Sequence, residues 1–196
     1  MPAGALDPLL GVWVGGRGRR MGGVQKALLR TPDGTETLLE RLLRVARAAG
    51  IAEVVLVGRA ELGEVARGLA QLPDTTSGIG PLGGLAALLD RAGERPALAL
   101  ACDMPYVSAQ LLARLARAPR GDAQVLAARD PASGKWQPLF ARYDASSVGP
   151  QLTAALAAGE TSFQALFRRL HAVELRLSAE EHAQLRDWDR PEDMRP

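Results

Sequence analysis

The chain has 196 residues, of which 47% are hydrophobic and 23% are charged. These values are ordinary for a globular protein and exclude a mainly disordered chain, and the length suits one domain. The 24 basic and 22 acidic residues leave a formal net charge of +2. Because both signs are mixed along the chain, the composition disfavours nucleic acid as a partner.

The single cysteine, Cys102, excludes an intrachain disulfide and a cysteine-rich zinc site. No stretch reaches 18 apolar residues, so no membrane span is expected, and residues 1–11 lack the basic start and apolar run of a signal peptide. We therefore expect a cytoplasmic protein with no membrane partner. We also expect a single domain over residues 1–196, in which residues 1–8 form a flexible N-terminal extension.

Apolar strands alternate with amphipathic helices along the chain. In chain order the pattern predicts a strand at 9–14, helix 37–49, strand 53–57, helices 62–72 and 82–92, strand 97–101, helix 109–118, strands 124–128 and 136–143, helices 147–158 and 162–170, a strand at 173–177 and a helix start at Ser178. This order predicts a three-layer α/β domain with a mainly parallel sheet. Ligands of such sheets bind beyond the carboxyl ends of the strands, where the loop after residue 14, the loop around Asp74, and Asp103 should gather.

The strongest local signal is the glycine-rich loop that precedes Lys26. Five glycines in nine residues let backbone N–H groups approach an anion, and Lys26 and three arginines of the loop add positive charge. The loop is neither a Walker A nor a Rossmann motif, because Gln25 precedes the lysine, Ala27 follows it, and the third Rossmann glycine is missing. We interpret it as a cradle for a polyphosphate; the alternative is a flexible surface loop with solvated arginines.

A second signal is a carboxylate at the end of a buried apolar strand, Asp103. Mg²⁺ prefers one or two carboxylates together with phosphate oxygens and water, so this residue is a candidate metal ligand. The alternative is an aspartate that only binds turn amides before the next helix. Its neighbour Cys102 is interpreted as a small buried residue and not as a nucleophile, since no histidine is near in the sequence.

These motifs resemble a known family. The spacing from Gly15-Gly16 through Arg20-Met21-Gly22 to Lys26 is similar to the signature loop of the nucleotidyltransferases that include molybdenum cofactor guanylyltransferase. Three positions depart from the family pattern: Trp13 and Val14 stand where Leu-Ala is usual, and Gln25 replaces an aspartate.

Other segments extend the resemblance from about residue 11 to residue 193. Residues 73–84 are similar to a segment that lies beside the nucleobase and ribose in the guanylyl branch, and residues 101–105 resemble the family's Cys-Asp-x-Pro metal site. Residues 134–140 resemble its substrate-side strand. Residues 187–193 look like its Asn-x-Asn-Thr-Pro-Glu-Asp element, with Asp187 and Asp189 in place of both asparagines; a solvated polar tail is the alternative.

The resemblance implies a Rossmann-like nucleotidyltransferase fold and transfer of GMP from GTP to the molybdopterin form of the molybdenum cofactor. The terminal phosphate of the acceptor would attack the α-phosphorus of GTP in line and release pyrophosphate. The implied catalytic residues are Lys26, Arg20 and Asp103. The implied nucleotide-binding residues are Trp13, Val14, Gly15, Gly16, Lys26, Asp74 and Asp103. The implied Mg²⁺ ligands are Asp103 and Asp189.

The implied partners are cofactor-biosynthesis proteins and the molybdoenzymes that receive the finished cofactor. Two alternatives stay open. One is a sister enzyme that uses CTP, or a sugar or polyol phosphate acceptor. The other is a catalytically silent nucleotide-binding adaptor, which Gln25 and the altered tail motif would suit.

Overall fold

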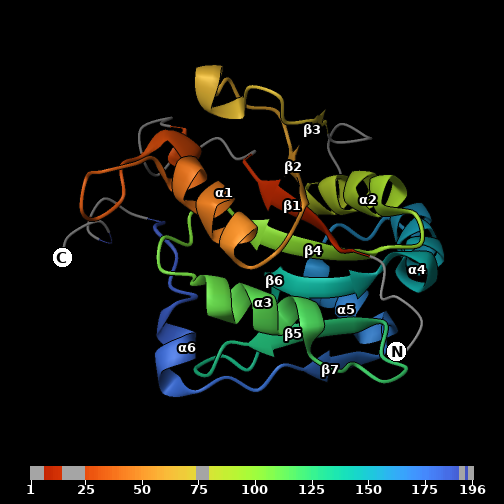
Figure 1. The fold of residues 1–196 in the computed structure, drawn as a ribbon. Coiled ribbons are helices and arrows are strands. Elements are labelled where there is room, and N and C mark those ends of the chain that lie inside the picture. Colours follow the sequence, from red (N-terminus) through yellow and green to blue (C-terminus); the bar gives the residue numbers. More distant parts are fainter. Residues whose placement is uncertain (1–6, 15–24, 74–79, 190–192, 194–196) are drawn as a thin grey trace.

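A computed structural model of the chain describes residues 7–14, 25–73, 80–189 and 193, which form one twisted sheet flanked by helices (Figure 1). The strands in chain order are β1 (Leu9–Trp13), β2 (Glu53–Val57), β3 (Gln71–Leu72), β4 (Pro96–Ala101), β5 (Val125–Arg129), β6 (Trp136–Asp144) and β7 (Ala172–Glu174). Their order in the sheet is β3-β2-β1-β4-β6-β5-β7.

The sheet is mainly parallel, as the alternation of elements predicts. β1 pairs in parallel with β2 and β4, β2 with β3, and β5 with β7, whereas β6 runs antiparallel to both β4 and β5. β6 is reversed because a tight turn at residues 130–134 joins it to β5 as a hairpin, with Gly134 at φ +67°. The carboxyl ends of β1, β2 and β4 consequently share one edge of the sheet.

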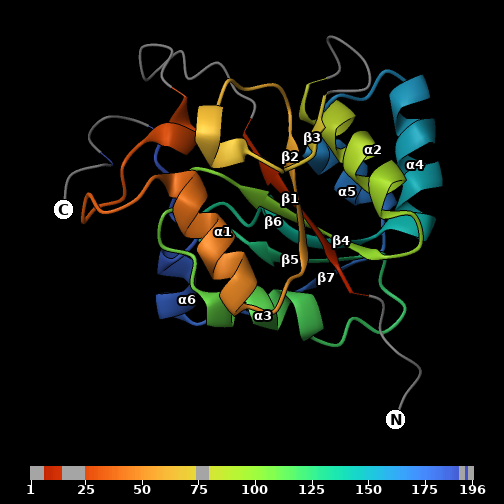
Figure 2. The same ribbon diagram turned by 45° about the horizontal axis from the view of Figure 1, so that its top comes forward.

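Helices cover both faces of the sheet (Figures 1 and 2). The main helices are α1 (Leu38–Ala48), α2 (Pro81–Ala92), α3 (Ala109–Arg117), α4 (Ala145–Ala157), α5 (Phe163–Arg169) and α6 (Ala179–Ala183). α1 and α3 pack on one face, and α2, α4 and α5 pack on the other. Among the helices of the described residues, none has the length and apolar character that crossing a bilayer requires.

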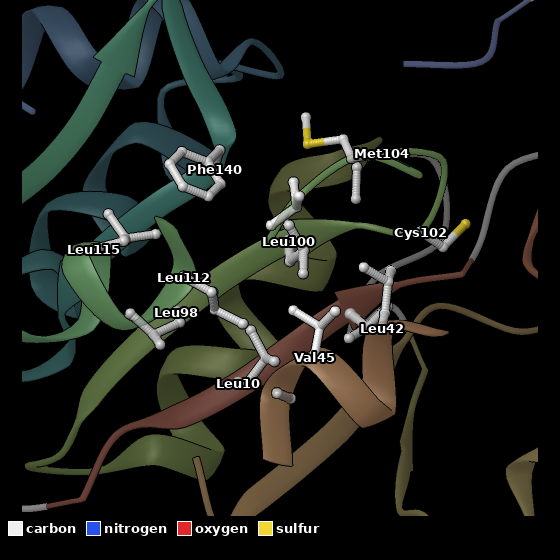
Figure 3. Packing of buried hydrophobic residues seen from close by; sticks show 14 of the residues in the cluster. Leu10, Leu42, Val45, Leu98, Leu100, Cys102, Met104, Leu112, Leu115 and Phe140 are labelled. Carbon is white, nitrogen blue, oxygen red and sulfur yellow. The ribbon is translucent and has the colours of Figure 1, made fainter. Parts of the chain in front are cut away.

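The core has two layers because strand side chains alternate between the faces. On one face, Leu10, Leu100 and Phe140 of the sheet meet Leu42 of α1 and Leu112 of α3, and all five are almost fully buried (Figure 3). Burial of each such side chain contributes roughly 1.5–3 kcal/mol to the stability of the folded chain. Met104 and Cys102 close this layer at the edge where β4 ends, so the turn that follows β4 is anchored in the core.

Gly11 in the middle of β1 allows α2 to pack closely on the sheet. A Cβ at this position would lie 2.8 Å from both Cδ atoms of Leu88 and 3.0 Å from Cγ2 of Val57. We expect Gly11→Ala to lower the free energy of unfolding by about 1–3 kcal/mol, because Leu88 is fully buried and overpacking forces it to shift. Urea denaturation measures the change.

The matched control for this substitution is Gly149→Ala in α4, where a Cβ would meet no atom of the described part of the chain within 4 Å. It should be neutral, or stabilising by up to about 1 kcal/mol, because alanine favours the helix. Equal unfolding midpoints for Gly11→Ala and the wild-type chain would contradict the close packing of α2 on β1.

One predicted element is wrong. The helix expected at 62–72 is instead a 3₁₀ turn, η3 (Gly63–Ala66), followed by the edge strand β3. Gly63 and Gly68 have φ values of +56° and +79°, a left-handed conformation that ends helices. The other predicted helices and strands are confirmed with ends that differ by up to three residues, including the capping box of Thr37 that starts α1.

Candidate active site

An ammonium group and two carboxylates meet at the carboxyl edge of the sheet. Lys26 opens the 3₁₀ turn η2 (Lys26–Leu28), and Asp103 stands two residues beyond the last residue of β4. The Lys26 Nζ donates hydrogen bonds to Asp103 Oδ2 at 2.8 Å and to Asp189 Oδ1 at 2.7 Å. Lys26 thus contacts two other predicted site residues, which lie 77 and 163 positions further along the chain.

Burial strengthens these ion pairs on one side of the site. The side chains of Lys26 and Asp103 are 16% and 17% exposed, whereas that of Asp189 is 49% exposed. Charges shielded from water interact more strongly than exposed charges. The ion pair between Lys26 and Asp103 is therefore the stronger of the two. The ion pair between Lys26 and the more exposed Asp189 is weaker and is broken more easily.

The C-terminal segment reaches this site because it is docked on the turn that follows β4. The Trp188 N–H donates to the Asp103 carbonyl oxygen at 2.9 Å, and the Trp188 side chain is 2% exposed. Its ring lies edge-on to Tyr106, with centroids 6.4 Å apart. Trp188 is therefore fixed on the turn after β4, and its neighbour Asp189 reaches the Lys26 ammonium.

A third carboxylate, Asp187, lies near the same cluster. Burial, followed by the negative charges of Asp189 and Asp103, raises the pKa of Asp187. Burial alone would lower the pKa of Lys26, but its hydrogen bonds and charge contacts with Asp103 and Asp189 outweigh burial and raise it. The site therefore keeps a charged ammonium amid an excess of negative charge, and such a cluster attracts a further cation.

The carboxylates fit a magnesium ion that also binds phosphate. Carboxylate oxygens are the ligands Mg²⁺ prefers, and one or two suffice when phosphate oxygens and water complete the octahedron. Within residues 7–14, 25–73, 80–189 and 193, no group of three or more acidic, histidine or cysteine side chains forms a metal cage. Asp103 and Asp189 supply two carboxylates, the number that suits a metal whose remaining ligands come from phosphate and water.

Cys102 lies beside Asp103 but is built into the core. Its side chain is 6% exposed, and burial, with a smaller contribution from the Asp103 charge, raises the pKa of the thiol to about 12. The thiol is therefore protonated near neutral pH, and a protonated thiol is a poor nucleophile. This arrangement agrees with the interpretation of Cys102 as a small buried residue.

We expect Cys102→Ala to keep the pyrophosphate release that the family resemblance implies within a few-fold of wild type, because the thiol is buried and protonated. A steady-state assay of pyrophosphate release measures the rate. Labelling by a thiol reagent should be slow in the folded wild-type chain and fast in urea. A hundredfold loss of turnover with unchanged stability would contradict a purely structural thiol.

Several predicted site residues lie outside the described residues. These are Gly15, Gly16, Arg20 and Asp74. Trp13, the last residue of β1, is 7% exposed and packs under α2, and its indole N–H has no hydrogen-bond partner among the residues that the structure describes. The Val14 N–H donates to the Val57 carbonyl oxygen at 3.0 Å, so this amide is already paired with β2.

An open cavity of about 600 Å³ adjoins the site beyond the ends of β2 and β3. Its lining residues are Gln25, Arg59, Ala60, Glu61, Gln71 and Pro73. Gln25, the residue before Lys26, is part of this lining, so the cavity lies next to the start of η2. Arg59 and Glu61 were not predicted as site residues, because two isolated charged residues form no recognisable motif. Their position just after β2, at the carboxyl edge of the sheet, is the signal that could have indicated them.

A mainly parallel sheet with a lysine and an aspartate in contact at its carboxyl edge is the arrangement expected of a protein of the nucleotidyltransferase class. Residues 12–174 match the family model described as MobA-like NTP transferase domain. The chain belongs to this MobA-like NTP transferase family.

Curated relatives and solved structures agree with that assignment. The chain is 38% identical to the probable molybdenum cofactor guanylyltransferase of Opitutus terrae, over 93% of this chain and 90% of the relative. It is 33% identical to the molybdenum cofactor guanylyltransferase of Pseudomonas putida, over 92% of each chain.

The fold matches molybdopterin-guanine dinucleotide biosynthesis protein A from Archaeoglobus fulgidus with a TM-score of 0.75 and 24% identity, covering 95% of this chain and 94% of the other. It also matches the 2-C-methyl-D-erythritol 4-phosphate cytidylyltransferase of Thermus thermophilus with a TM-score of 0.63 and 20% identity, covering 96% and 95%. The resemblance and the predicted fold class are confirmed.

Proposed function

We propose that this chain is a molybdenum cofactor guanylyltransferase, which transfers GMP from GTP to the molybdopterin cofactor and releases pyrophosphate. The observation that carries the proposal is the contact of Lys26 with Asp103 and Asp189 at the carboxyl edge of the sheet. The names of the curated relatives supply the nucleotide and the acceptor.

The ion-pair cluster suggests how the triphosphate is received. The Lys26 ammonium would exchange its contact with the more exposed Asp189 for a phosphate oxygen and keep its contact with Asp103. Asp103 and Asp189 would hold Mg²⁺, which when bound neutralises phosphate charge. Arg20, Gly15 and Gly16 would complete the cradle with a guanidinium and backbone N–H groups, which stabilise charge on the phosphates.

The reaction needs positioning and charge neutralisation more than covalent chemistry. An oxygen of the acceptor's terminal phosphate forms a bond to the α-phosphorus of GTP, while the bond from that phosphorus to the β-phosphate bridging oxygen breaks. The departing pyrophosphate carries the bonding electrons, and Lys26 stabilises the charge that develops there. Cys102 takes no part, because its protonated thiol is buried.

The guanosine would occupy the cavity beyond β2 and β3, whose lining includes Pro73, the residue before the predicted base- or ribose-binding Asp74. Gln25 joins this cavity to Lys26, so a nucleotide lying there brings its phosphates to the ammonium. Arg59 and Glu61 supply one positive and one negative group at the cavity wall. The guanidinium can donate hydrogen bonds to acceptor atoms of a purine base, and the carboxylate can accept hydrogen bonds from its N–H groups.

The experiment is an assay of pyrophosphate release by the full chain with Mg²⁺ and molybdopterin. GTP should support turnover, and CTP, ATP and UTP should give rates at least tenfold lower. Turnover with CTP alone would favour the sister-enzyme alternative. GTP binding without pyrophosphate release would favour the silent adaptor, and either result would overturn the proposal. A cytoplasmic location and contacts with cofactor-biosynthesis proteins and recipient molybdoenzymes belong to the same proposal.

A further inference from the structure

The β5–β6 hairpin carries a guanidinium–aromatic stack at the carboxyl edge of the sheet. The Arg129 Cζ lies 3.8 Å from the centroid of the Trp136 ring. The Phe167 ring packs against the same indole, with centroids 5.4 Å apart and an angle of 34° between the planes. We propose that the Arg129–Trp136 stack binds the flat pterin ring system of the acceptor, an inference that rests on the proposed function.

Hydrogen bonds hold both members of the stack in place. The backbone N–H of Trp136 donates to Gln164 Oε1 at 3.3 Å, and the Gln164 Nε2 donates back to the backbone carbonyl oxygen of Trp136 at 2.8 Å. The Arg129 Nη1 donates to the Gly134 carbonyl oxygen at 2.8 Å. A platform that is already ordered loses little conformational entropy when a ligand binds to it.

The turn of the hairpin fixes the direction of Arg129. The pairing of β5 with β6 shifts by a bulge between Ala127 and Arg129, and bulges commonly redirect a side chain beside an active site. The Asp130 N–H donates to the Lys135 carbonyl oxygen at 2.8 Å and closes the turn just beyond the bulge. The position of the guanidinium is thus set by the backbone and not by a flexible loop.

The stack stands on the acceptor side of the Lys26–Asp103 contact. The last pair between β4 and β6 joins Leu100 to Phe140, so Trp136 at the start of β6 lies roughly 13 Å beyond the level of Leu100, at about 3.3 Å per residue. Asp103 lies beyond Leu100 on the same edge. In the sheet order, β1 and β4 separate β6 and β5 from the cavity at β2 and β3.

This order matches what an in-line transfer requires. With the nucleotide on the β2 side and the phosphates at Lys26, the attacking group has to approach from the β6 side. The half-buried residues 136–139 form the wall on that side, whereas residues 140–143 are fully buried in the sheet. The arrangement of the β5–β6 hairpin beside the end of β4 can be followed in Figures 1 and 2.

The chemistry of the stack suits a flat, anionic ligand. A guanidinium is planar and stacks through either face. One face of Arg129 lies on Trp136, and the side chain is 42% exposed, which leaves its other face accessible to a heterocycle. Glu174 Oε2 is 4.0 Å from Arg129 Nε, at the limit of an ion pair, so Arg129 retains positive charge to attract a ligand that ends in a phosphate.

The test measures binding of 6-carboxypterin and of Mg-GTP by calorimetry to the full chain and three variants. Arg129→Lys keeps the charge but loses the planar stack, Trp136→Leu removes the ring beneath it, and Arg91→Lys is the control. Arg91 is an exposed arginine that pairs with Glu53 at the first residue of β2, on the opposite edge of the sheet.

We expect Arg129→Lys and Trp136→Leu to weaken pterin binding about tenfold, the size of a stacking contact, and to leave the Kd for Mg-GTP within twofold. In the transfer assay, Arg129→Lys should raise KM for molybdopterin and leave kcat unchanged, because the contact is equal in the ground and transition states. Arg91→Lys should match the wild type throughout.

Wild-type pterin affinity in Arg129→Lys, or no pterin binding by the wild-type chain at millimolar concentration, would overturn the inference. Normal GMP transfer with unchanged pterin affinity in Arg129→Lys would reject the stack and leave the proposed function standing. Weakened pterin binding in that variant, with no pyrophosphate release by the wild type, would reject the proposed function and support the stack.

Discussion

Lys26→Ala should lower kcat/KM for GTP by about 10²–10³-fold, the loss typical of removing one donor that stabilises charge in a transition state. The ammonium is the hydrogen-bond donor shared by Asp103 and Asp189, at 2.8 and 2.7 Å. Its removal takes away the charge that would meet the phosphates and leaves the two carboxylates facing each other. Pyrophosphate release at varied GTP concentration measures the loss.

A surface charge substitution is the control for this variant. Arg91→Ala also removes a cation that pairs with a carboxylate, but at the amino edge of the sheet, and should leave the rate unchanged. The thermal midpoint of Lys26→Ala should stay close to that of the wild type. A rate within a few-fold of wild type would show that Lys26 is only a structural ion-pair partner and would reject the cradle.

Asp103→Asn is expected to cause a similar loss of about 10²–10³-fold and to weaken the dependence of the rate on Mg²⁺. The Asp103 side chain is only 17% exposed and makes the more buried of the two contacts to Lys26. The substitution keeps the shape of the side chain but removes the charge that would hold a divalent ion. It should also lower the pKa of Lys26, because the hydrogen bond and charge of Asp103 raise it.

Asp189→Asn provides the matched comparison. It is the same chemical change on the more exposed partner, whose side chain is 49% accessible, and it restores the asparagine that the family pattern has at this position. We expect a loss of no more than about tenfold, because exposed charge contacts are weak. Mg²⁺ titrations of both variants decide the ranking; a larger loss in Asp189→Asn would assign the leading metal role to the tail.

Sequence patterns predicted a helix or strand correctly where a single local interaction, such as a helix cap, determines where the element begins. The Thr37 hydroxyl accepts from the Glu40 N–H at 3.2 Å, and the Glu40 carboxylate accepts from the Thr37 N–H at 2.7 Å, which is the predicted capping box of α1. The Ser108 hydroxyl caps α3 in the same way, through the Leu111 N–H at 3.2 Å. The buried strand before Asp103 was equally clear, because strands covered on both faces are continuously apolar.

Local signals failed where two patterns competed. Residues 62–72 have enough apolar residues at helical spacing to suggest a helix, but Gly63 and Gly68 adopt positive φ and divide the segment. No local pattern indicated that Trp13 packs under α2, or that Asp187 lies close enough to Asp189 and Asp103 for their charges to help raise its pKa.

Residue order and periodicity were sufficient to predict the α/β class and most element positions, because capping, turn chemistry and apolar alternation act over a few residues. They also placed Lys26 and Asp103 at the same edge of the sheet, where the two side chains are in contact. The seating of residues 187–189 on the turn after β4, the cavity beside β2, and the Arg129–Trp136 stack were not predictable in that way. Each joins segments that the folded sheet brings together, and their positions depend on packing and long-range hydrogen bonds that leave no local pattern in the chain.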